Sequence, residues 1–461
     1  MNHAPETTAQ PIAQPAPPEA AVIPGPTLAD FEHAQRTVAP VARRTPMETS
    51  RHLGRLIGAP VHLKCENLQR TGSYKLRGAF NRLSALSAGE RARGVVAASA
   101  GNHAQGVAYA ARELGIRATI FMPVGVALPK LEATRDYGAD VVLSGETIGE
   151  TLEAAARFAD ETGATIIPPF DHADVVAGQG TLGLEILEQA PDATTVVVPI
   201  GGGGLASGVA SAMKQKAAAL GRSIRVIGVQ AENAAPYVPS LALGEAVTVP
   251  VVPTIADGIA VYRPGELNLE IIRESVDEVV TVTEDDIARA LLVLLERAKL
   301  VVEPAGAVGV AALMTGKVEA DGPVVVVLSG GNIDPLLMQR VIAHGLAASD
   351  RYLTLRIGLP DRPGQLARIS ELLAEAKANV VEVLHTRHGA GMQISEVALE
   401  LSVETRGPPT GPRSSRSCAA RATNPRSSRS DAVAASATPP PPRNAERPRS
   451  GGRSRSVSTG H

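Results

Sequence analysis

One lysine of the chain stands where its amine could act as a nucleophile. Lys75 lies in the segment KCENLQRTGSYKLRGAFNRL, in which a helical pattern starts around Ser73–Lys75. Gly72 and Gly78 flank this lysine, and the aromatic Tyr74 precedes it. An amine that is partly buried at the positive end of a helix has a lowered pKa and can form a Schiff base with a carbonyl cofactor. A single lysine is more often a solvated surface charge, so the assignment depends on the motifs that accompany it.

A run of glycines marks a candidate phosphate site. In the segment VVVPIGGGGL, Gly201–Gly204 separate the apolar strand Val196–Ile200 from a helix that begins near Leu205. Free backbone N–H groups and the helix dipole at such a junction attract an anion. The alternative is a flexible turn. No lysine follows in the manner of a nucleotide-binding P-loop, and the spacing does not fit the dinucleotide fingerprint. These two observations favour a site for a single phosphate group.

Further motifs follow strands or begin helices. The segment SAGNH, Ser99–His103, comes after the strand Val95–Ala98 and offers a second helix N-terminus, which is suited to a carboxylate. Asn102 adds an amide donor, although Ser and Asn are also ordinary helix caps. Ser329 follows an apolar strand in VVVVLSGGN, at the strand end where catalytic groups gather in open α/β sheets. Glu303, in VEPAGA, begins another helix, where it could be a simple N-terminal charge.

The elements that must hold these residues alternate along the chain from about Thr27 to Leu346. Short β-branched runs are separated by longer helical patterns, and several runs are apolar throughout, as is typical of strands covered on both faces. The alternation predicts an α/β protein with a doubly wound, mainly parallel fold. The expected strands are Val61–Lys64, Val95–Ala98, Ala118–Met122, Val141–Leu143, Thr165–Pro168, Val196–Ile200, Arg225–Val229, Val279–Val282 and Val324–Leu328, and the expected helices include His103–Leu114, Ile148–Thr162, Leu205–Ala217 and Glu284–Leu300.

Composition argues against several classes of partner. The chain of 461 residues is 44% hydrophobic, which allows a large core, and its net charge of −2 gives no general attraction to nucleic acid. Aromatic residues make up 2% and Trp is absent, which disfavours a base-stacking surface. The apolar runs are too short to cross a membrane. Cys65 and Cys418 lack metal-like spacing, so we expect a cytoplasmic protein without disulfides.

The two ends of the chain have compositions of their own. Residues 1–26 are rich in Pro and Ala, and we expect them to be disordered. After residue 350 the sequence predicts strands at Tyr352–Leu359, Asn379–Thr386 and Ile394–Val403, with an amphipathic helix after the first. From Pro408 onward the chain consists largely of Pro, Arg and Ser, with too few large apolar residues to fold.

Together, the motifs resemble those of the serine/threonine dehydratases, which are pyridoxal-phosphate (PLP) enzymes of fold type II with two doubly wound open sheets. The similarity runs from about Thr45 to about Asn332, with KCENLQRTGSYKLRGA, SAGNHAQG, GGGGL, VEPAGA and LSGGN in the family's order. It implies a threonine ammonia-lyase of amino-acid metabolism, including isoleucine biosynthesis, that converts L-threonine to 2-oxobutanoate and L-serine to pyruvate, with release of ammonia.

The resemblance also implies a role for each matching residue. Lys75 carries PLP, Tyr74 lies beside the cofactor ring, Asn102 bonds the phenolic oxygen and Ser329 bonds the ring nitrogen. The phosphate is held by Gly201, Gly202, Gly203, Gly204 and Leu205, and the substrate carboxylate is received by Ser99, Ala100, Gly101, Asn102 and His103.

A mechanism follows from these roles. The freed Lys75 takes the α-proton, the conjugated ring accepts the carbanion charge, and the β-hydroxyl leaves with a proton from the cofactor phosphate. A serine such as Ser329 does not stabilise a full positive charge on the ring nitrogen as an aspartate would. The ring is then a milder electron sink, which suits prompt elimination.

Other functions remain as alternatives. Cysteine and threonine synthases carry a threonine after the loop asparagine, where this chain has His103. Serine racemases, which are closer relatives, need a serine before the loop glycine as a second base, and here that position is Ala100. Racemases and some dehydratases also bind a divalent cation through Glu and Asp, but Glu232 has no second carboxylate after it, so no metal is expected. From a different class, the chain could be a catalytically dead amino-acid sensor.

The C-terminal pattern resembles an ACT domain, a small amino-acid-binding module of order βαββαβ, with Asp361–Gly364 as its ligand turn. Only the first strand, the helix and the next two strands are recognisable, so we expect a partial ferredoxin-like βαβ module. The abrupt change of composition after Gly407 suggests that the reading frame shifts there, with a genuine disordered tail as the alternative.

The expected organisation is therefore a disordered segment, a catalytic domain, a partial regulatory domain and a tail. An amino-acid or nucleotide effector and a homo-oligomer, dimer or tetramer, are the partners expected besides the substrate. The domain ranges are 1–26, 27–346 with a smaller subdomain at about 66–170, 350–407 and 408–461.

Overall fold

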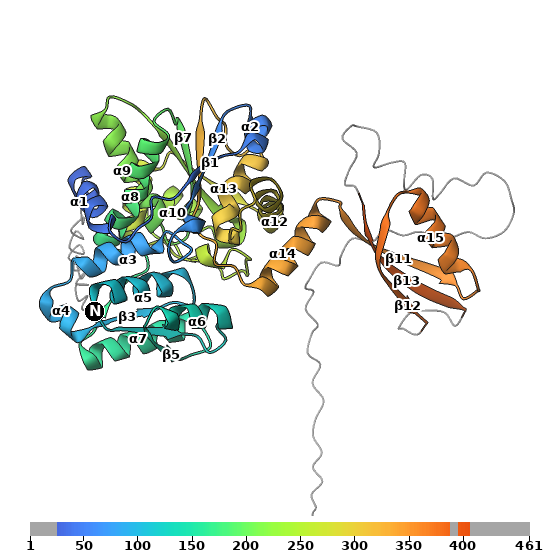
Figure 1. Cartoon of the computed structure of the whole chain (residues 1–461), viewed down its shortest axis with the longest axis horizontal. Coiled ribbons are helices and arrows are strands. Elements are labelled where there is room, and N and C mark those ends of the chain that lie inside the picture. The colour runs from blue at the N-terminus through green and yellow to red at the C-terminus, as the bar shows by residue number, and fades with distance from the viewer. Residues whose placement is uncertain (1–24, 388–394, 406–461) are drawn as a thin grey trace, which may run out of the picture. The chain divides into compact units, whose positions relative to one another are not determined.

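The structure is a computed structural model, and it describes residues 25–387 and 395–405. The chain divides into two compact units between Leu346 and Ala347. The first unit contains two separate sheets and the second contains a third sheet (Figure 1). Disorder was expected of residues 1–26 and 408–461. Residues 1–24 and 408–461, and the frame shift proposed after Gly407, lie outside the described residues.

The larger sheet of the first unit has six strands, and all of them are parallel except the edge strand β1. Every residue of the central strands β10 and β7 is buried, as expected of continuous apolar runs covered on both faces. The strands lie in the order β1 (Met47–Thr49), β2 (Val61–Cys65), β10 (Val324–Leu328), β7 (Thr195–Pro199), β8 (Arg225–Ala231) and β9 (Glu278–Val282).

Helices cover both faces of this sheet. Side chains of one face pack with helices α2, α12 and α13, and those of the other face pack with α8, α9, α10 and α11. Alternate residues of a strand therefore enter different cores, as with Val326 and Val325 of β10. The helices are α2 (Arg51–Ile57), α8 (Ala173–Gln189), α9 (Gly204–Ala219), α10 (Tyr237–Leu243), α11 (Glu266–Ser275), α12 (Glu284–Val293) and α13 (Pro304–Met314).

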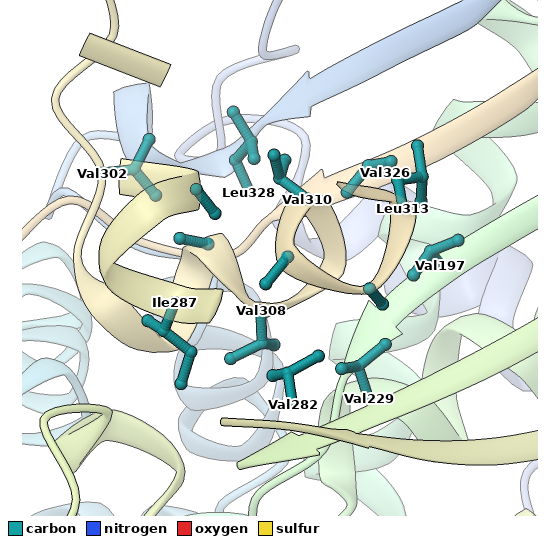
Figure 2. Close-up of a cluster of buried hydrophobic side chains, with 14 of the residues drawn as sticks. Val197, Val229, Val282, Ile287, Val302, Val308, Val310, Leu313, Val326 and Leu328 are labelled. Atoms are coloured by element: carbon teal, nitrogen blue, oxygen red, sulfur yellow. The ribbon is translucent and has the colours of Figure 1, made fainter. Parts of the chain in front are cut away.

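Helix α13 lies deepest among them, since ten of its eleven residues are buried. Figure 2 shows its side chains Val308, Val310 and Leu313 among those of the neighbouring strands, in one cluster of buried apolar residues. This core fixes the start of α13, where Glu303 is the N-cap, against the carboxyl ends of the strands.

The smaller sheet of the first unit has four parallel strands. Helices α3, α5 and α6 pack on one face, and α7 packs on the other. The order is β5 (Asp140–Leu143), β4 (Ala118–Met122), β3 (Val95–Ala98) and β6 (Thr165–Ile166), and the helices are α3 (Lys75–Ser84), α4 (Ala88–Arg93), α5 (Asn102–Leu114), α6 (Leu128–Asp136) and α7 (Ile148–Thr162).

Local sequence signals set many of the element boundaries. Helix α7 begins after Thr147, whose side chain accepts a hydrogen bond from the Glu150 amide, and ends at Gly163 with a φ of 71°. The expected helix Glu284–Leu300 differs from the observed one. Helix α12 ends at Val293 and continues as a π-helical turn to Ala298. The turn stops there because Lys299 takes a left-handed conformation with a φ of 61°.

The second unit has the expected β–α–β–β order and an antiparallel sheet. Its elements are β11 (Tyr352–Pro360), α15 (Gln365–Glu375), β12 (Asn379–Thr386) and β13 (Glu396–Glu404), with β13 in the centre. Alternate residues of β13, from Val397 to Val403, form its core together with Leu359. Helix α14 (Pro335–Ala348) spans the boundary between the two units, and α1 (Leu28–Val38) packs against α8 in the first unit. No helix within the described ranges combines the length and apolar character needed to cross a bilayer.

Candidate active site

A cavity of about 620 Å³ lies where the carboxyl ends of strands from both sheets of the first unit meet. Ala98 ends β3, Pro199 ends β7 and Ser329 directly follows β10, and all three line the cavity. Ligands bind at this strand end in open α/β sheets. The structure brings every site residue predicted from the sequence into this one wall: Tyr74, Lys75, Ser99, Ala100, Gly101, Asn102, His103, Gly201, Gly202, Gly203, Gly204, Leu205 and Ser329.

Lys75 is held in the cavity by a turn that is fixed to the end of β10. The Tyr74 amide donates a hydrogen bond to the Ser329 carbonyl over 3.1 Å, and Ser73 forms an isolated bridge with Gly330. Helix α3 then begins at Lys75. Helix α5 packs closely against this start, since a Cβ on Gly106 would lie 3.1 Å from the Lys75 carbonyl carbon. The position of Lys75 is therefore fixed from two sides.

The Lys75 amine has few polar partners. Its Nζ donates to the Pro169 carbonyl over 2.9 Å and lies 5.3 Å from the centre of the Tyr74 ring. Burial lowers the pKa of Lys75 to about 8, against a smaller opposing effect of the Glu303 carboxylate. A lowered pKa was expected from the sequence, with burial and a helix dipole as its causes, and burial is the main cause. A neutral, nucleophilic amine is thus accessible near neutral pH.

The glycine run forms the entry to helix α9. Gly203 is the N-cap with a φ of 101°, and no side chain caps the helix. A Cβ on Gly202 would lie 2.5 Å or less from three ring carbons of Phe170, and one on Gly203 would collide with the Tyr237 hydroxyl. Gly204 is less tightly confined, since its Cβ would lie 3.0 Å from Phe170 Cβ. The loop therefore presents backbone only, at the N-terminus of a long helix, which suits an anion.

Asn102 is oriented by two neighbours. Its Nδ2 donates to Glu303 Oε1 over 2.7 Å, and its Oδ1 accepts from Asn332 Nδ2 over 2.8 Å. One N–H of the amide is left for a ligand. Helix α5 is capped by Gly101 without a side-chain hydrogen bond, so Asn102 and Ser99 are not its caps.

Two titratable side chains beside Asn102 have shifted pKa values. Burial, together with the charge of Asp257, raises the pKa of Glu303 to about 8. Burial lowers the pKa of His103 to about 3, so this ring is neutral. His103 Nε2 lies 2.9 Å from the Ile167 carbonyl, and because a carbonyl only accepts, that nitrogen carries the proton.

Comparison with known proteins agrees with this geometry. The sequence family described as pyridoxal-phosphate dependent enzyme matches residues 38–330. The chain belongs to this family. A second family, the ACT domain, matches residues 353–408.

Individual relatives point the same way. This family member is 49% identical to L-threonine ammonia-lyase of Thermotoga maritima over 380 residues, which is 82% of this chain and 94% of that protein. It is similar to the solved structure of the processed form of threonine deaminase isoform 2 from Solanum lycopersicum, with 36% identity, a TM-score of 0.65 and coverage of 72% of this chain and 93% of that one. Maize serine racemase gives 35% identity, a TM-score of 0.65 and coverage of 70% and 98%.

The residues of the cavity fit pyridoxal phosphate. The cofactor requires an amine for its aldehyde, a site for one phosphate and a polar partner for its ring nitrogen. Lys75 supplies a buried amine, and Gly201–Gly204 form a backbone loop that is packed so closely that a Cβ on Gly202 or Gly203 would collide with neighbouring side chains. The Ser329 hydroxyl, at the end of β10, is a neutral partner that both donates and accepts.

Sequence reasoning missed the segment Pro169–Asp171 of this PLP-family site. Pro169 accepts the hydrogen bond of Lys75, Phe170 packs against Gly202 and Gly204, and Asp171 accepts from two amides at the start of α11. The segment follows β6, so the strand-end rule that pointed to Ser329 would also have pointed here.

An ion pair at the cavity wall was also missed. Lys130 Nζ of α6 lies 2.7 Å from Asp257 Oδ2, and both residues line the cavity. Lys130 had no motif around it, and the two residues are 127 positions apart. The pair joins the helix layer of the smaller sheet to a segment of the larger one.

Proposed function

We propose that this chain is a PLP-dependent L-threonine ammonia-lyase that also accepts L-serine, with Lys75 as the lysine that carries the cofactor. The observation that carries the proposal is the 49% identity to the Thermotoga maritima L-threonine ammonia-lyase over 94% of that protein. The amine, the glycine cradle and the hydroxyl gathered in one cavity support it independently.

Bound PLP supplies a conjugated ring that accepts the electron pair left on the α-carbon of the substrate. Lys75 then acts as the base, because its neutral Nζ can take the α-proton. A pKa of about 8 places this amine where it can both accept and return a proton at physiological pH. The Pro169 carbonyl orients Nζ through the 2.9 Å hydrogen bond.

The other residues bind and orient. Backbone N–H groups of Gly201–Gly204 would bind the phosphate at the start of α9, and Ser329 would offer the ring nitrogen a neutral hydroxyl. The free N–H of Asn102 would be available to the phenolic oxygen of bound PLP, and Tyr74 and Leu205 line the cavity that would hold it. A serine in place of a carboxylate at the ring nitrogen would make the ring a milder electron sink, which favours elimination.

The loop Ser99–His103 receives the substrate carboxylate. It precedes the 13-residue helix α5, whose N-terminus has no side-chain cap, so its backbone N–H groups are available to an anion. The neutral His103 adds no competing charge. Overall, L-threonine loses water and then ammonia, the water is regained on hydrolysis, and 2-oxobutanoate is released.

Serine racemisation is the second candidate, because this chain is also 35% identical to maize serine racemase. Ala100 argues against it. A racemase needs a second acid-base group on the opposite face of the cofactor, and a methyl side chain in the substrate loop has no proton to exchange.

The ACT unit suggests that an effector regulates the enzyme. Its proposed ligand turn, Asp361–Gly364, leads into α15 through Gly364 with a φ of 89°, a conformation that favours glycine. An amino acid is the expected effector and a nucleotide the alternative. We place the enzyme in the cytoplasm as a homo-oligomer.

The decisive assay measures products. PLP-loaded protein given L-threonine should release 2-oxobutanoate and ammonia in equal amounts, and L-serine should give pyruvate with little D-serine. Absence of any 2-oxo acid would contradict the lyase. Formation of D-serine at a rate close to that of pyruvate would favour the racemase instead.

A further inference from the structure

One backbone carbonyl of the glycine loop is held by three donors. The Gly202 carbonyl accepts from Tyr237 Oη over 3.0 Å, from Asn268 Nδ2 over 3.2 Å and from the Gly265 amide over 3.4 Å. Tyr237 and Asn268 are both 0% exposed and lie outside the cavity wall. A carbonyl usually needs one or two partners, so this concentration of donors calls for a reason.

The geometry of the peptide bond supplies it. The Gly202 carbonyl and the Gly203 N–H belong to one planar trans peptide and point in opposite directions. Gly203 lines the cavity, whereas the donors to the Gly202 carbonyl approach from the protein interior. Drawing the carbonyl inward therefore turns the Gly203 N–H toward the cavity. The reverse orientation would present a partial negative charge to an anion.

A loop of four glycines needs such restraint. Gly203 has a φ of 101°, and glycines reach both signs of φ with little cost, so the sequence alone does not fix this peptide. Substituting a larger residue would restrict the loop but would collide with Tyr237. Side chains outside the loop must therefore select the orientation.

Both side chains are committed to this carbonyl. Burial raises the pKa of the Tyr237 hydroxyl, which keeps it a donor. Asn268 Oδ1 is buried and has no hydrogen-bond partner, so the amide satisfies Gly202 at the expense of its own oxygen.

The backbone that carries Asn268 is fixed in turn. Asp171 accepts from the Glu266 amide over 3.0 Å and from the Asn268 amide over 3.2 Å, which caps the start of α11. Asp171 follows Phe170, the ring that packs against Gly202 and Gly204. The segment Phe170–Asp171 thus packs against the glycine loop and also fixes the backbone that carries Asn268.

We infer that Tyr237 and Asn268 are positioning residues that orient the Gly202–Gly203 peptide so that its N–H binds the cofactor phosphate. This inference rests on the proposed PLP function. It predicts that the two side chains affect binding of the phosphate group alone. Their removal should therefore weaken the binding of PLP but not that of pyridoxal, which lacks the phosphate.

The test compares the dissociation constants of PLP and pyridoxal for the apoprotein. Tyr237→Phe removes only the hydroxyl, and Asn268→Leu removes the amide at similar volume. Each should weaken PLP binding about five- to tenfold, the effect of losing one buried hydrogen bond, with little change for pyridoxal. The double variant should lose more than either, because the carbonyl then keeps only the Gly265 amide.

Tyr137→Phe is the matched control. Its hydroxyl also donates to a backbone carbonyl, that of Arg70 over 3.4 Å, but Tyr137 does not line the cavity. The control should bind PLP and pyridoxal as the wild type does. Thermal melting of each apoprotein provides a separate measure of folding.

Three results would overturn the inference. The first is an unchanged preference for PLP over pyridoxal in both variants. The second is an equal loss of affinity for both ligands together with a lowered melting temperature, and the third is a loss of PLP affinity in Tyr137→Phe equal to that in the two variants. Failure of the wild-type protein to bind PLP at all would instead contradict the proposed function.

Discussion

A methyl group at Gly202 tests the shape of the phosphate cradle. In Gly202→Ala the new Cβ would lie 2.5 Å or less from three ring carbons of Phe170. Carbon atoms in contact normally lie about 3.5–4.0 Å apart, so the loop or the ring must move by about 1 Å. Gly202 does not have a positive φ, so the collision and not backbone strain is what the substitution introduces.

The magnitude follows from this collision. An extra methyl in a close-packed site costs about 1–3 kcal/mol. If the loop takes up the displacement, its N–H groups leave the phosphate, and PLP affinity falls about 5- to 150-fold at 1.4 kcal/mol per tenfold change. Titration of the apoprotein with PLP, followed by intrinsic or cofactor fluorescence, measures this loss.

Two further variants distinguish the collision with the Phe170 ring from a general effect of adding a methyl group. Gly149→Ala adds the same methyl in helix α7, where the nearest atom is Thr147 Oγ1 at 3.8 Å, and it should leave PLP affinity unchanged. Phe170→Ala removes the ring, so Gly202→Ala should do less harm in that background than in the wild type. Wild-type affinity in Gly202→Ala, or an equal loss with and without the Phe170 ring, would refute the reasoning.

The remaining predictions concern the amine, the reaction outcome and a buried carboxyl. Lys75→Ala should lose the visible absorbance of lysine-bound PLP and the lyase activity while its circular dichroism stays native, and normal turnover would refute the assignment. Ala100→Ser places a hydroxyl in the substrate loop and should raise D-serine formation from L-serine, measured by chiral chromatography; no increase would mean that the residue does not face the α-carbon. Burial and the Asp257 carboxylate raise the folded pKa of Glu303 from 4.5 to about 8, and the hydrogen bond from Asn102 is the largest opposing influence. Such a group stabilises the folded state fully below pH 4.5 and loses this contribution as the pH rises to about 8, so the melting temperature of Glu303→Gln should rise relative to that of wild type across this window. A constant difference between the two melting curves would contradict the shift.

The sequence predicted the elements whose signals are local. The run VVVVL of β10 is apolar at every position because both faces of the strand are covered, and its bounds are those expected from the sequence. Ser329 and Ser99 could be placed at the cavity from the sequence because each directly follows such a strand, and parallel strands bring their carboxyl ends together. The expectation of a parallel α/β fold is confirmed by the two sheets and by the family match.

The missed residues depend on contacts between distant parts of the chain. Tyr237 lies 35 positions from the carbonyl that it holds, and Asn268 lies 66 positions away. Tyr237 begins the short helix α10, and neither residue belongs to a recognisable motif. Edge strand β1, with three residues, is likewise too short for an alternating pattern to be detected. Packing, not local sequence preference, decides each of these cases.

Lys75 is the lysine that we propose carries the cofactor. Another buried lysine, Lys64, offers a contrast, since its amine is committed to Glu185 over 2.8 Å and to the Thr45 carbonyl over 2.8 Å. Reduction of the PLP-loaded protein with sodium borohydride, followed by peptide mass spectrometry, locates the attachment site directly. We predict a single modified peptide that contains Lys75. Modification at Lys64, at Lys130 or at no lysine would contradict it.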